Sequence, residues 1–308
     1  MTDSTQTLSL ESLLRSATEL LRAADVDTPR ADAELLAAHV LGASRGQVSA
    51  WAVSGRQLDA VQSVDLRRLA ISRSTRTPLQ YLTGTTAFRT VDLKVGHGVF
   101  LPRPETEVVA GAAIEAARGA AQPLVIDLCT GSGAIAASVA IEVPGATVHA
   151  VEADPEAAWW AAANLEPLGV RLHVADAATA LPELDGRADV VVSNPPYVPD
   201  GRVPAQAEAR RDPERALYGG GADGMRMPTV VAAAAARLLR PGGTFVMEHD
   251  ETQGGLVAGL LQDGTGAGSG AGSGELGAGL FTAIETRDDL TGRPRYTVAV
   301  RTDGTMAR

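Results

Sequence analysis

The sequence predicts an α/β fold in which a small all-helical domain precedes a doubly wound parallel sheet. Two observations carry this prediction. Apolar residues of the first eighty or so positions recur at three- and four-residue spacing, which is typical of amphipathic helices. From Pro123 onward, apolar strand-like runs alternate with helical segments, as in a parallel sheet covered on both faces. A length of 308 residues is sufficient for two domains.

The N-terminal section contains three predicted helices. Leucines over 8–24 share one helical face, Thr28-Pro29 opens a second helix that Gly42 ends, and residues 58–72 form a third. No residue of this section has a catalytic pattern. We therefore predict that residues 1–85 form a substrate-recognition domain, that 86–100 form a hairpin linker, and that 101–308 carry the chemistry.

The second section begins with the motif LPRPETE over 101–107, in which Thr106 is placed to cap a helix that starts near Glu107. The predicted strands are 124–128, 146–151, 170–174, 189–192 and 244–248, with 281–286 and 296–301 as a closing pair. A helix over 228–240 is expected to end at Pro241-Gly242-Gly243. Residues 263–279 are rich in glycine and predict a flexible loop.

Composition excludes several classes of protein. The sequence has 45% hydrophobic residues but no apolar run of membrane-spanning length, and its start lacks the basic and apolar regions of an export signal. A single cysteine, Cys129, excludes an internal disulfide and fits a reducing compartment. The net charge of −10 argues against a binder of duplex nucleic acid. We expect a cytoplasmic protein that binds neither a membrane nor nucleic acid directly.

The most informative stretch is Ser193-Asn194-Pro195-Pro196-Tyr197, which follows the buried strand at 189–192. The two prolines force the chain out of the sheet into a fixed loop beyond the carboxyl end of the strand, where ligands of α/β sheets bind. An asparagine oxygen and a proline carbonyl together accept both hydrogens of a planar NH2 group, and the tyrosine ring covers its face. The stretch therefore predicts catalytic roles for Asn194, Pro195 and Tyr197, with Pro196 beside them in the substrate site.

A second constellation indicates an adenosyl cofactor. Asp127 ends the first strand of the sheet, and a loop of small residues follows it, which lets the backbone approach a ligand: Cys129, Thr130, Gly131, Ser132 and Gly133. The third glycine of a dinucleotide fingerprint is missing. Glu152 ends the second strand, where a carboxylate accepts ribose hydroxyls, and Asp176 ends the third, near an adenine. Because no phosphate cradle or nearby Walker lysine is present, S-adenosylmethionine fits better than a nucleoside triphosphate.

Over nearly its whole length the sequence resembles the bacterial peptide-chain release factor N5-glutamine methyltransferases of the HemK/PrmC family. The resembling stretches are PLQYLTG (78–84), LPRPETE (101–107), DLCTGSGAIA (127–136), SNPPYVP (193–199), RDPERALYGGGADGM (211–225) and LLRPGGTFVMEHDETQ (238–253). The resemblance implies a Rossmann-like S-adenosylmethionine-dependent methyltransferase domain. It also implies transfer of a methyl group to the side-chain amide nitrogen of the glutamine in the Gly-Gly-Gln motif of translation release factors, with S-adenosylhomocysteine as product.

The resemblance assigns roles to single residues. It implies that Asn194 touches cofactor and substrate, that Pro195, Pro196 and Tyr197 frame the glutamine amide, and that further cofactor contacts come from Phe100, Asp127, Cys129, Thr130, Gly131, Ser132, Gly133, Glu152, Asp176 and Ala177. Two positions depart from the family: Ala177 stands where an aromatic residue is frequent, and His249-Asp250 stands where Ile-Gly follows the glutamate. No metal is predicted, because the histidines at 97, 149, 173 and 249 lack ligand spacing.

Two alternatives use the same motifs. Adenine-N6 methyltransferases also carry NPPY, but a basic, target-reading region is expected of them, and this chain is acidic. A non-catalytic adaptor could use the helical domain for binding and keep the cofactor for stability. The intact Asn194–Tyr197 motif argues against an adaptor.

Overall fold

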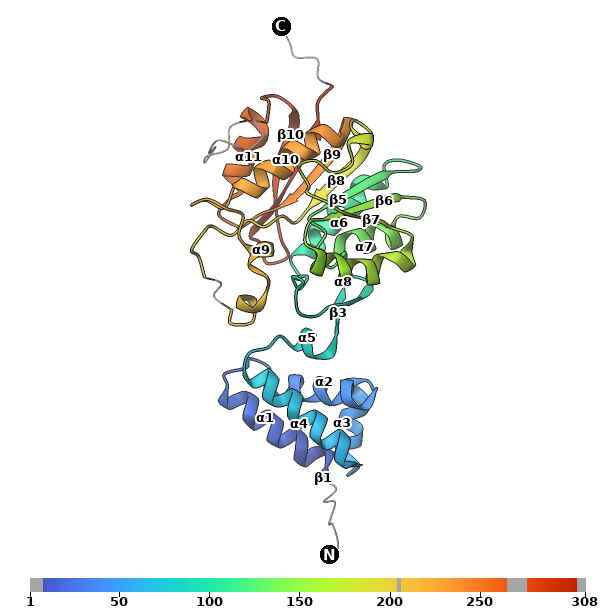
Figure 1. The fold of residues 1–308 in the computed structure, drawn as a ribbon, viewed down its shortest axis with the longest axis vertical. Helices are drawn as coiled ribbons and strands as arrows, with labels where there is room; N and C mark the ends of the chain where they lie inside the picture. Colours follow the sequence, from blue (N-terminus) through green and yellow to red (C-terminus); the bar gives the residue numbers. More distant parts are fainter. Residues whose placement is uncertain (1–7, 204–205, 265–275, 304–308) are drawn as a thin grey trace, which may run out of the picture. The chain divides into compact units, whose positions relative to one another are not determined.

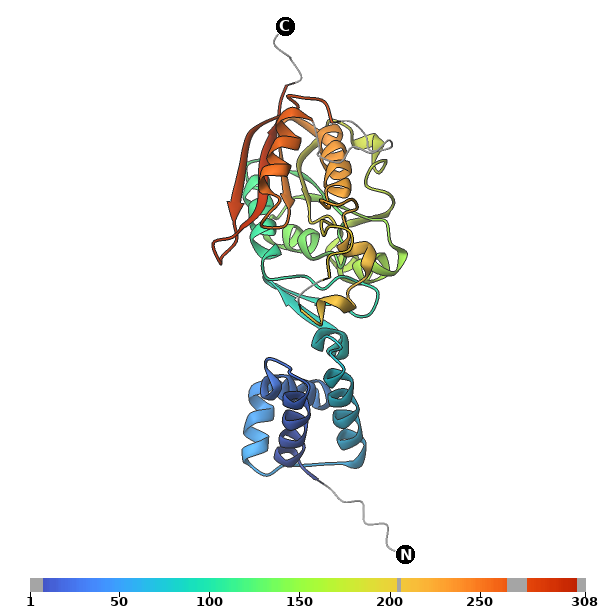
Figure 2. The ribbon, with the colours of Figure 1, turned by 90° about the vertical axis from the view of Figure 1, so that its left-hand side faces the viewer.

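The computed structural model describes residues 8–203, 206–264 and 276–303. The chain forms two compact units (Figures 1 and 2). The first consists of residues 1–85 together with 204–211, and the second of 86–203 together with 212–308. The glycine-rich loop predicted over 263–279 falls largely outside the described residues. No helix of the described ranges is both long and apolar enough to cross a membrane.

The first unit is a helical bundle with a small strand pair. Its elements are α1 (Leu10–Ala23), α2 (Pro29–Leu41), α3 (Arg45–Val53), α4 (Ala60–Ser74), α5 (Leu79–Thr83), β1 (Leu8–Ser9) and β2 (Gln57–Leu58). Leu10, Leu13, Leu14 and Leu21 of α1 lie in a core shared with α2 and α4, whereas Leu20 is exposed. Gly42 ends α2 as predicted, in the left-handed region at φ 58°. Helix α3 was not predicted, although the Ser44–Gln47 capping box marks its start.

A buried ion cluster lies in this unit. Arg73 of α4 pairs with Asp32 of α2 and with Glu208, each at 2.8 Å, and the side chains of Arg73 and Asp32 are only 8% and 6% exposed. Glu208 also pairs with Arg76 at 2.8 Å. Glu208 belongs to a segment that follows the NPPY motif by about ten residues along the chain. The helical unit therefore includes a piece of the later chain, held by charges that have little access to water.

The second unit is built on a seven-stranded sheet in the order β10-β11-β9-β8-β5-β6-β7. Its strands are β5 (Leu124–Leu128), β6 (Thr147–Glu152), β7 (Arg171–Val174), β8 (Ala188–Ser193), β9 (Leu239–Glu248), β10 (Phe281–Asp288) and β11 (Pro294–Arg301). The five from β5 to β9 run parallel, and β11 and β10 add antiparallel strands beside β9. The separate hairpin β3 (Thr85–Phe88) and β4 (Val91–Lys94) precedes the sheet. This arrangement confirms the predicted doubly wound fold.

Helices lie on both faces of the sheet: α6 (Thr106–Ala117), α7 (Ala134–Glu142), α8 (Pro155–Leu165), α10 (Arg226–Leu238) and α11 (Gly254–Asp263), with the short α9 (Glu214–Leu217) before α10. Alternate strand residues face opposite sides. Ile126, Val191 and Phe245 share one core with residues of α10 and α11. Helix α6 contacts β8 and β9, and α7 contacts β5 and β6.

The order of the strands creates a crevice. From β5 the chain moves outward through β6 and β7, and then returns to the other side of β5 to form β8 and β9. Helices that follow β5 and β8 therefore diverge, which leaves a crevice at the carboxyl ends of these two strands. Ser193 Oγ closes the base of the crevice by donating to the Leu128 carbonyl at 2.7 Å.

One boundary differs from the sequence prediction. Pro241-Gly242-Gly243 was expected to end a helix, but the chain is already extended there as part of β9. The register with β8 shifts between Ala188 and Val190, beside this segment. A Cβ on Gly243 would lie 2.9 Å from the Ala188 carbonyl oxygen, so the close approach of the two strands requires a glycine.

The ion cluster of the helical unit gives a stability prediction. Arg73→Ala should lower the free energy of unfolding of this unit by about 3–5 kcal/mol, because it leaves a buried carboxylate unpaired. Arg68→Ala, on the same helix, is the control, since its 3.5 Å ion pair with Asp65 is largely exposed and should contribute less than about 1 kcal/mol. Hydrogen exchange of the α2 and α4 amides measures both; equal effects would contradict a structural role for the cluster.

Candidate active site

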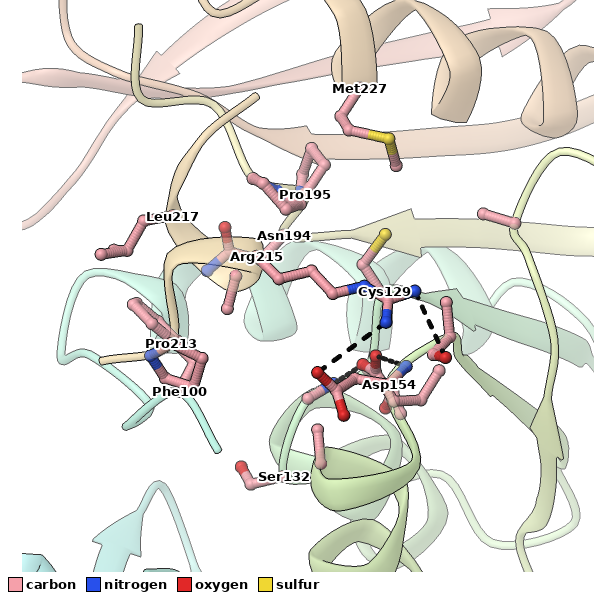
Figure 3. A pocket seen from close by; sticks show the side chains of 18 of the residues that line it. Phe100, Cys129, Ser132, Asp154, Asn194, Pro195, Pro213, Arg215, Leu217 and Met227 are labelled. Carbon is pink, nitrogen blue, oxygen red and sulfur yellow. Dashed lines mark hydrogen bonds and ion pairs between the residues drawn. The ribbon is translucent and has the colours of Figure 1, made fainter. Parts of the chain in front are cut away.

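The crevice contains a cavity of about 520 Å³ that brings most of the predicted site residues together (Figure 3). Its wall comes from the carboxyl ends of β5, β6 and β8 and from the segments around them. The predicted residues that line it are Phe100, Cys129, Thr130, Gly131, Ser132, Glu152, Asp176, Ala177, Asn194, Pro195, Pro196 and Tyr197. Strands far apart in sequence thus supply one site.

Asp127 and Gly133 were predicted to contact the cofactor, but they lie behind the loop and do not line the cavity. Asp127 is 1% exposed, and its Oδ2 accepts from Thr130 Oγ1 at 2.5 Å and from the Ala136 amide at 3.2 Å. Burial raises the pKa of this carboxyl to about 7. Gly133 adopts φ 85°, and a Cβ there would meet the Leu165 side chain at 2.8 Å. Both residues therefore support the conformation of the loop, Asp127 through its hydrogen bonds and Gly133 through its positive φ and close packing against Leu165.

Glu152 ties this loop to the end of β6. Its Oε2 accepts from the Gly131 amide at 2.9 Å, and its Oε1 accepts from the Asp154 amide at 2.8 Å. Burial is the largest influence on this carboxyl and raises its pKa, while the backbone donors act in the opposite direction. Each carboxylate oxygen has two lone pairs, so acceptor capacity remains for hydroxyl groups of a ligand in the cavity.

The thiol of Cys129 is unsuited to nucleophilic chemistry. Cys129 directly follows β5 and adopts the left-handed region at φ 59°. Burial raises the pKa of the thiol far above its usual value, so it stays neutral, and the thiolate is the reactive form. Beyond β7, Asp176 Oδ1 accepts from the Ala178 amide at 2.9 Å, and the small Ala177 leaves room beside it.

The NPPY loop is held from behind by the segment that follows it. The Val198 amide donates to the Leu217 carbonyl at 2.8 Å, and Gln253 Nε2 donates to the Tyr197 carbonyl at 2.9 Å. Gly224 has φ 72°, and a Cβ on it would lie 2.1 Å from the Tyr197 carbonyl oxygen. Only glycine allows this packing, which explains why a glycine-rich run follows the motif.

The contact of Asn194 fixes which end of its amide faces the cavity. Its Nδ2 donates to Thr106 Oγ1 at 3.2 Å, and no described residue donates to its Oδ1. The amide therefore presents an acceptor oxygen to the cavity that it lines. The prediction that Thr106 caps α6 was wrong: the helix begins at Thr106, and no side chain caps it.

Tyr197 points its hydroxyl away from solvent. The hydroxyl donates to Glu248 Oε1 at 3.2 Å, at the end of β9. Burial, followed by the nearby Glu248 charge, raises the pKa of Tyr197 well above its usual value, so the phenol stays protonated. The ring is consequently fixed at both ends, by the backbone loop and by this hydrogen bond.

The rim of the cavity contains residues that sequence reasoning missed. The guanidinium of Arg103 pairs with the buried Asp212, and the Leu101 amide donates to the same carboxylate at 3.5 Å. This ion pair joins LPRPETE to RDPERAL, so Phe100 and Pro213 line one cavity. The sequence did contain a signal for this ion pair, because Arg103 and Asp212 carry opposite charges and each is next to a proline. Arg215 also reaches the rim, where it donates to the Ala153 carbonyl at 3.4 Å.

Comparison with known proteins agrees with this geometry. Residues 12–84 match the PrmC N-terminal domain family, and residues 112–222 match the methyltransferase small domain family. The chain is 42% identical to a release factor glutamine methyltransferase of Bifidobacterium longum over 94% of this chain and 98% of the relative. It is 43% identical to one of Streptomyces coelicolor, over 92% and 95% respectively. The chain therefore belongs to the release factor glutamine methyltransferase family.

Proposed function

We propose that the protein transfers the methyl group of S-adenosylmethionine to the side-chain amide nitrogen of the glutamine in the Gly-Gly-Gln motif of translation release factors. The observation that carries this proposal is the Asn194 amide, which presents its oxygen to the cavity because Thr106 holds its nitrogen. An acceptor at this place suits an incoming NH2 group. The names of the relatives agree with this substrate.

The cavity suits S-adenosylmethionine in size and chemistry. Its volume of about 520 Å³ is within the range of about 300–1,000 Å³ that small-molecule sites have. Glu152 would accept the ribose hydroxyls, Asp176 and Ala177 would lie beside the adenine, and the loop around Gly131 would follow the methionine end. When bound, S-adenosylmethionine supplies a methyl group on a positively charged sulfur.

The residues on the other side of the cavity orient the nucleophile. A carboxamide nitrogen reacts poorly because its lone pair is delocalised, so its alignment and the stabilisation of developing charge decide the rate. Asn194 Oδ1 and the Pro195 carbonyl would accept its two N–H bonds, and the Tyr197 ring would cover one face. The nitrogen gains a bond to the methyl carbon as the carbon–sulfur bond breaks, and it then releases one proton to water.

The helical unit is proposed to recognise the release factor. Three apolar side chains of α4 are exposed although they lie on one face: Val61 (71%), Val64 (61%) and Ile71 (59%). An exposed apolar stripe of this kind is typical of a protein-binding surface. The acidic charge of −10 disfavours the alternative of an adenine-N6 methyltransferase acting on nucleic acid. Release factors act in the cytoplasm, so we propose that location.

Asn194→Ala should lower kcat on the order of 10²–10³-fold, because it removes a preorganised polar contact to the reacting amide. The affinity for S-adenosylmethionine should stay nearly unchanged. Asn194→Asp keeps an acceptor but places a charge near the sulfonium, so it should bind the cofactor at least as tightly while turning over slowly. Single-turnover rates and calorimetry measure the two effects; an Asn194→Ala enzyme with wild-type kcat would exclude the proposed contact.

Glu152→Ala should weaken S-adenosylmethionine binding by about 1–3 kcal/mol, which is the scale of hydrogen bonds to a charged group. Glu156→Ala is the matched control, because it removes the same charge four positions away, outside the cavity. Calorimetry on the folded variants compares their dissociation constants. Equal affinities of the two variants would contradict a direct role of Glu152 in the cofactor site.

Val64→Asp should raise KM for an intact release factor by about tenfold, which corresponds to about 1.4 kcal/mol, and should leave cofactor affinity unchanged. Val53→Asp is the control: Val53 is 91% exposed at the end of α3 but does not belong to the α4 stripe. The measurement is the initial rate of methylation as a function of release factor concentration. A similar KM for both variants would show that this stripe does not bind the substrate.

A further inference from the structure

Arg215 is the one basic residue among the described residues that line the cavity, and the proposed reaction does not use it (Figure 3). It lies on α9, in the segment that follows the NPPY loop. The other charged side chains of the lining are all acidic: Glu152, Asp154, Asp176 and Glu214. A single cation among these acids marks the place in the wall that suits an anionic group of a ligand.

The backbone that carries Arg215 is held firmly, whereas its guanidinium is held loosely. The ion pair of the buried Asp212 with Arg103 fixes the start of the segment. The guanidinium donates to the Ala153 carbonyl at 3.4 Å and lies 3.9 Å from the Asp154 carboxylate, and the Arg215 side chain is 62% exposed. Long, exposed contacts of this kind contribute little. The guanidinium, which has five N–H donors, can therefore turn to a stronger acceptor in the cavity without disturbing the fold.

The guanidinium reaches from α9 to the end of β6, where the ribose is proposed to bind. Its two contacts, Ala153 and Asp154, directly follow Glu152, the proposed acceptor for the ribose hydroxyls. In S-adenosylmethionine the methionine part is joined to the ribose through the sulfur, so its carboxylate stays near the ribose. This carboxylate is also the only anionic group of the cofactor, because adenine and ribose are neutral and the sulfonium and ammonium groups are positive.

The loop after β5 offers the carboxylate few free donors. The Thr130 amide donates to the Val151 carbonyl at 3.0 Å, and the Gly133 amide donates to the Thr130 carbonyl at 2.9 Å. The Gly131 amide donates to Glu152 Oε2 at 2.9 Å. These amides would have to give up a hydrogen bond in order to bind the carboxylate. A guanidinium with unused donors has no such cost, and its planar fork matches the two oxygens of a carboxylate.

We propose that Arg215 binds the methionine carboxylate of S-adenosylmethionine. This proposal rests on the proposed function, because it assigns a partner to one group of the proposed cofactor. The guanidinium would exchange its 3.4 Å contact with a neutral carbonyl for a charge-assisted hydrogen bond. Arg215 consequently makes the site prefer adenosyl ligands that carry this carboxylate.

Calorimetry with two ligands tests the contact, because decarboxylated S-adenosylmethionine differs from S-adenosylmethionine only in lacking the carboxylate. Each ligand is titrated into the full-length wild type, Arg215→Ala and Arg202→Ala. Arg202 is the matched control: its side chain is 57% exposed, it pairs with Asp250 at 3.4 Å, and it does not line the cavity. Its removal takes away the same charge, so it shows how the overall field acts on two ligands that differ by one charge.

We expect Arg215→Ala to weaken the binding of S-adenosylmethionine about tenfold, the effect of a charge-assisted hydrogen bond at a partly exposed site. The affinity for the decarboxylated ligand should stay nearly unchanged. The preference of the wild type for the ligand with the carboxylate should therefore fall about tenfold in this variant, which measures the pairwise contact. Arg202→Ala should bind both ligands as the wild type does.

The proposal is overturned if Arg215→Ala binds S-adenosylmethionine as tightly as the wild type does. It is also overturned if the variant loses affinity for both ligands alike, or if Arg202→Ala shows the same selective loss. A wild type that binds neither ligand would refute the proposed function, and this proposal with it. A wild type that binds S-adenosylmethionine, together with an Arg215→Ala variant of unchanged preference, would refute only the contact.

Discussion

The site depends on the divergence of the chain on either side of β5. Because β6 and β7 lie on one side and β8 and β9 on the other, the loops after β5 and β8 leave the sheet side by side without a helix between them. The hydrogen bond from Ser193 Oγ to the Leu128 carbonyl locks the two strand ends together. The loop after β5 then lines one side of the cavity and the loop after β8 lines the other, and we propose that the first holds the cofactor and the second the substrate.

Around this crevice, charged groups act mainly by holding backbone in place. Glu152 joins the loop after β5 to the end of β6 by accepting from the amides of Gly131 and Asp154. Asp212 holds the LPRPETE segment through Arg103. The buried carboxyls Asp127 and Glu248 support the two loops from below, and burial raises the pKa of each to about 7. Folding therefore favours their protonated forms, so their contribution to stability falls as pH rises from the usual carboxyl range toward 7.

Local patterns predicted much of the fold. The alternation of apolar strands and helices predicted the succession of strands and helices along the chain, and Gly42 marked the end of α2. Such local patterns do not predict contacts between segments that lie far apart in the sequence. Nothing local shows that Glu208 joins the helical unit or that Asp212 meets Arg103. Thr106 has the local features of a cap, yet its hydroxyl contacts Asn194, because the tertiary fold brings β8 beside the start of α6.

The central claim is that the cavity aligns a protein glutamine amide for methyl transfer. Tandem mass spectrometry of a purified release factor, after incubation with this protein and S-adenosylmethionine, tests it most directly. We predict one added methyl group on the side-chain nitrogen of the glutamine in the Gly-Gly-Gln motif. An unmodified glutamine, with methyl label appearing instead in adenine of nucleic acid, would contradict the assignment.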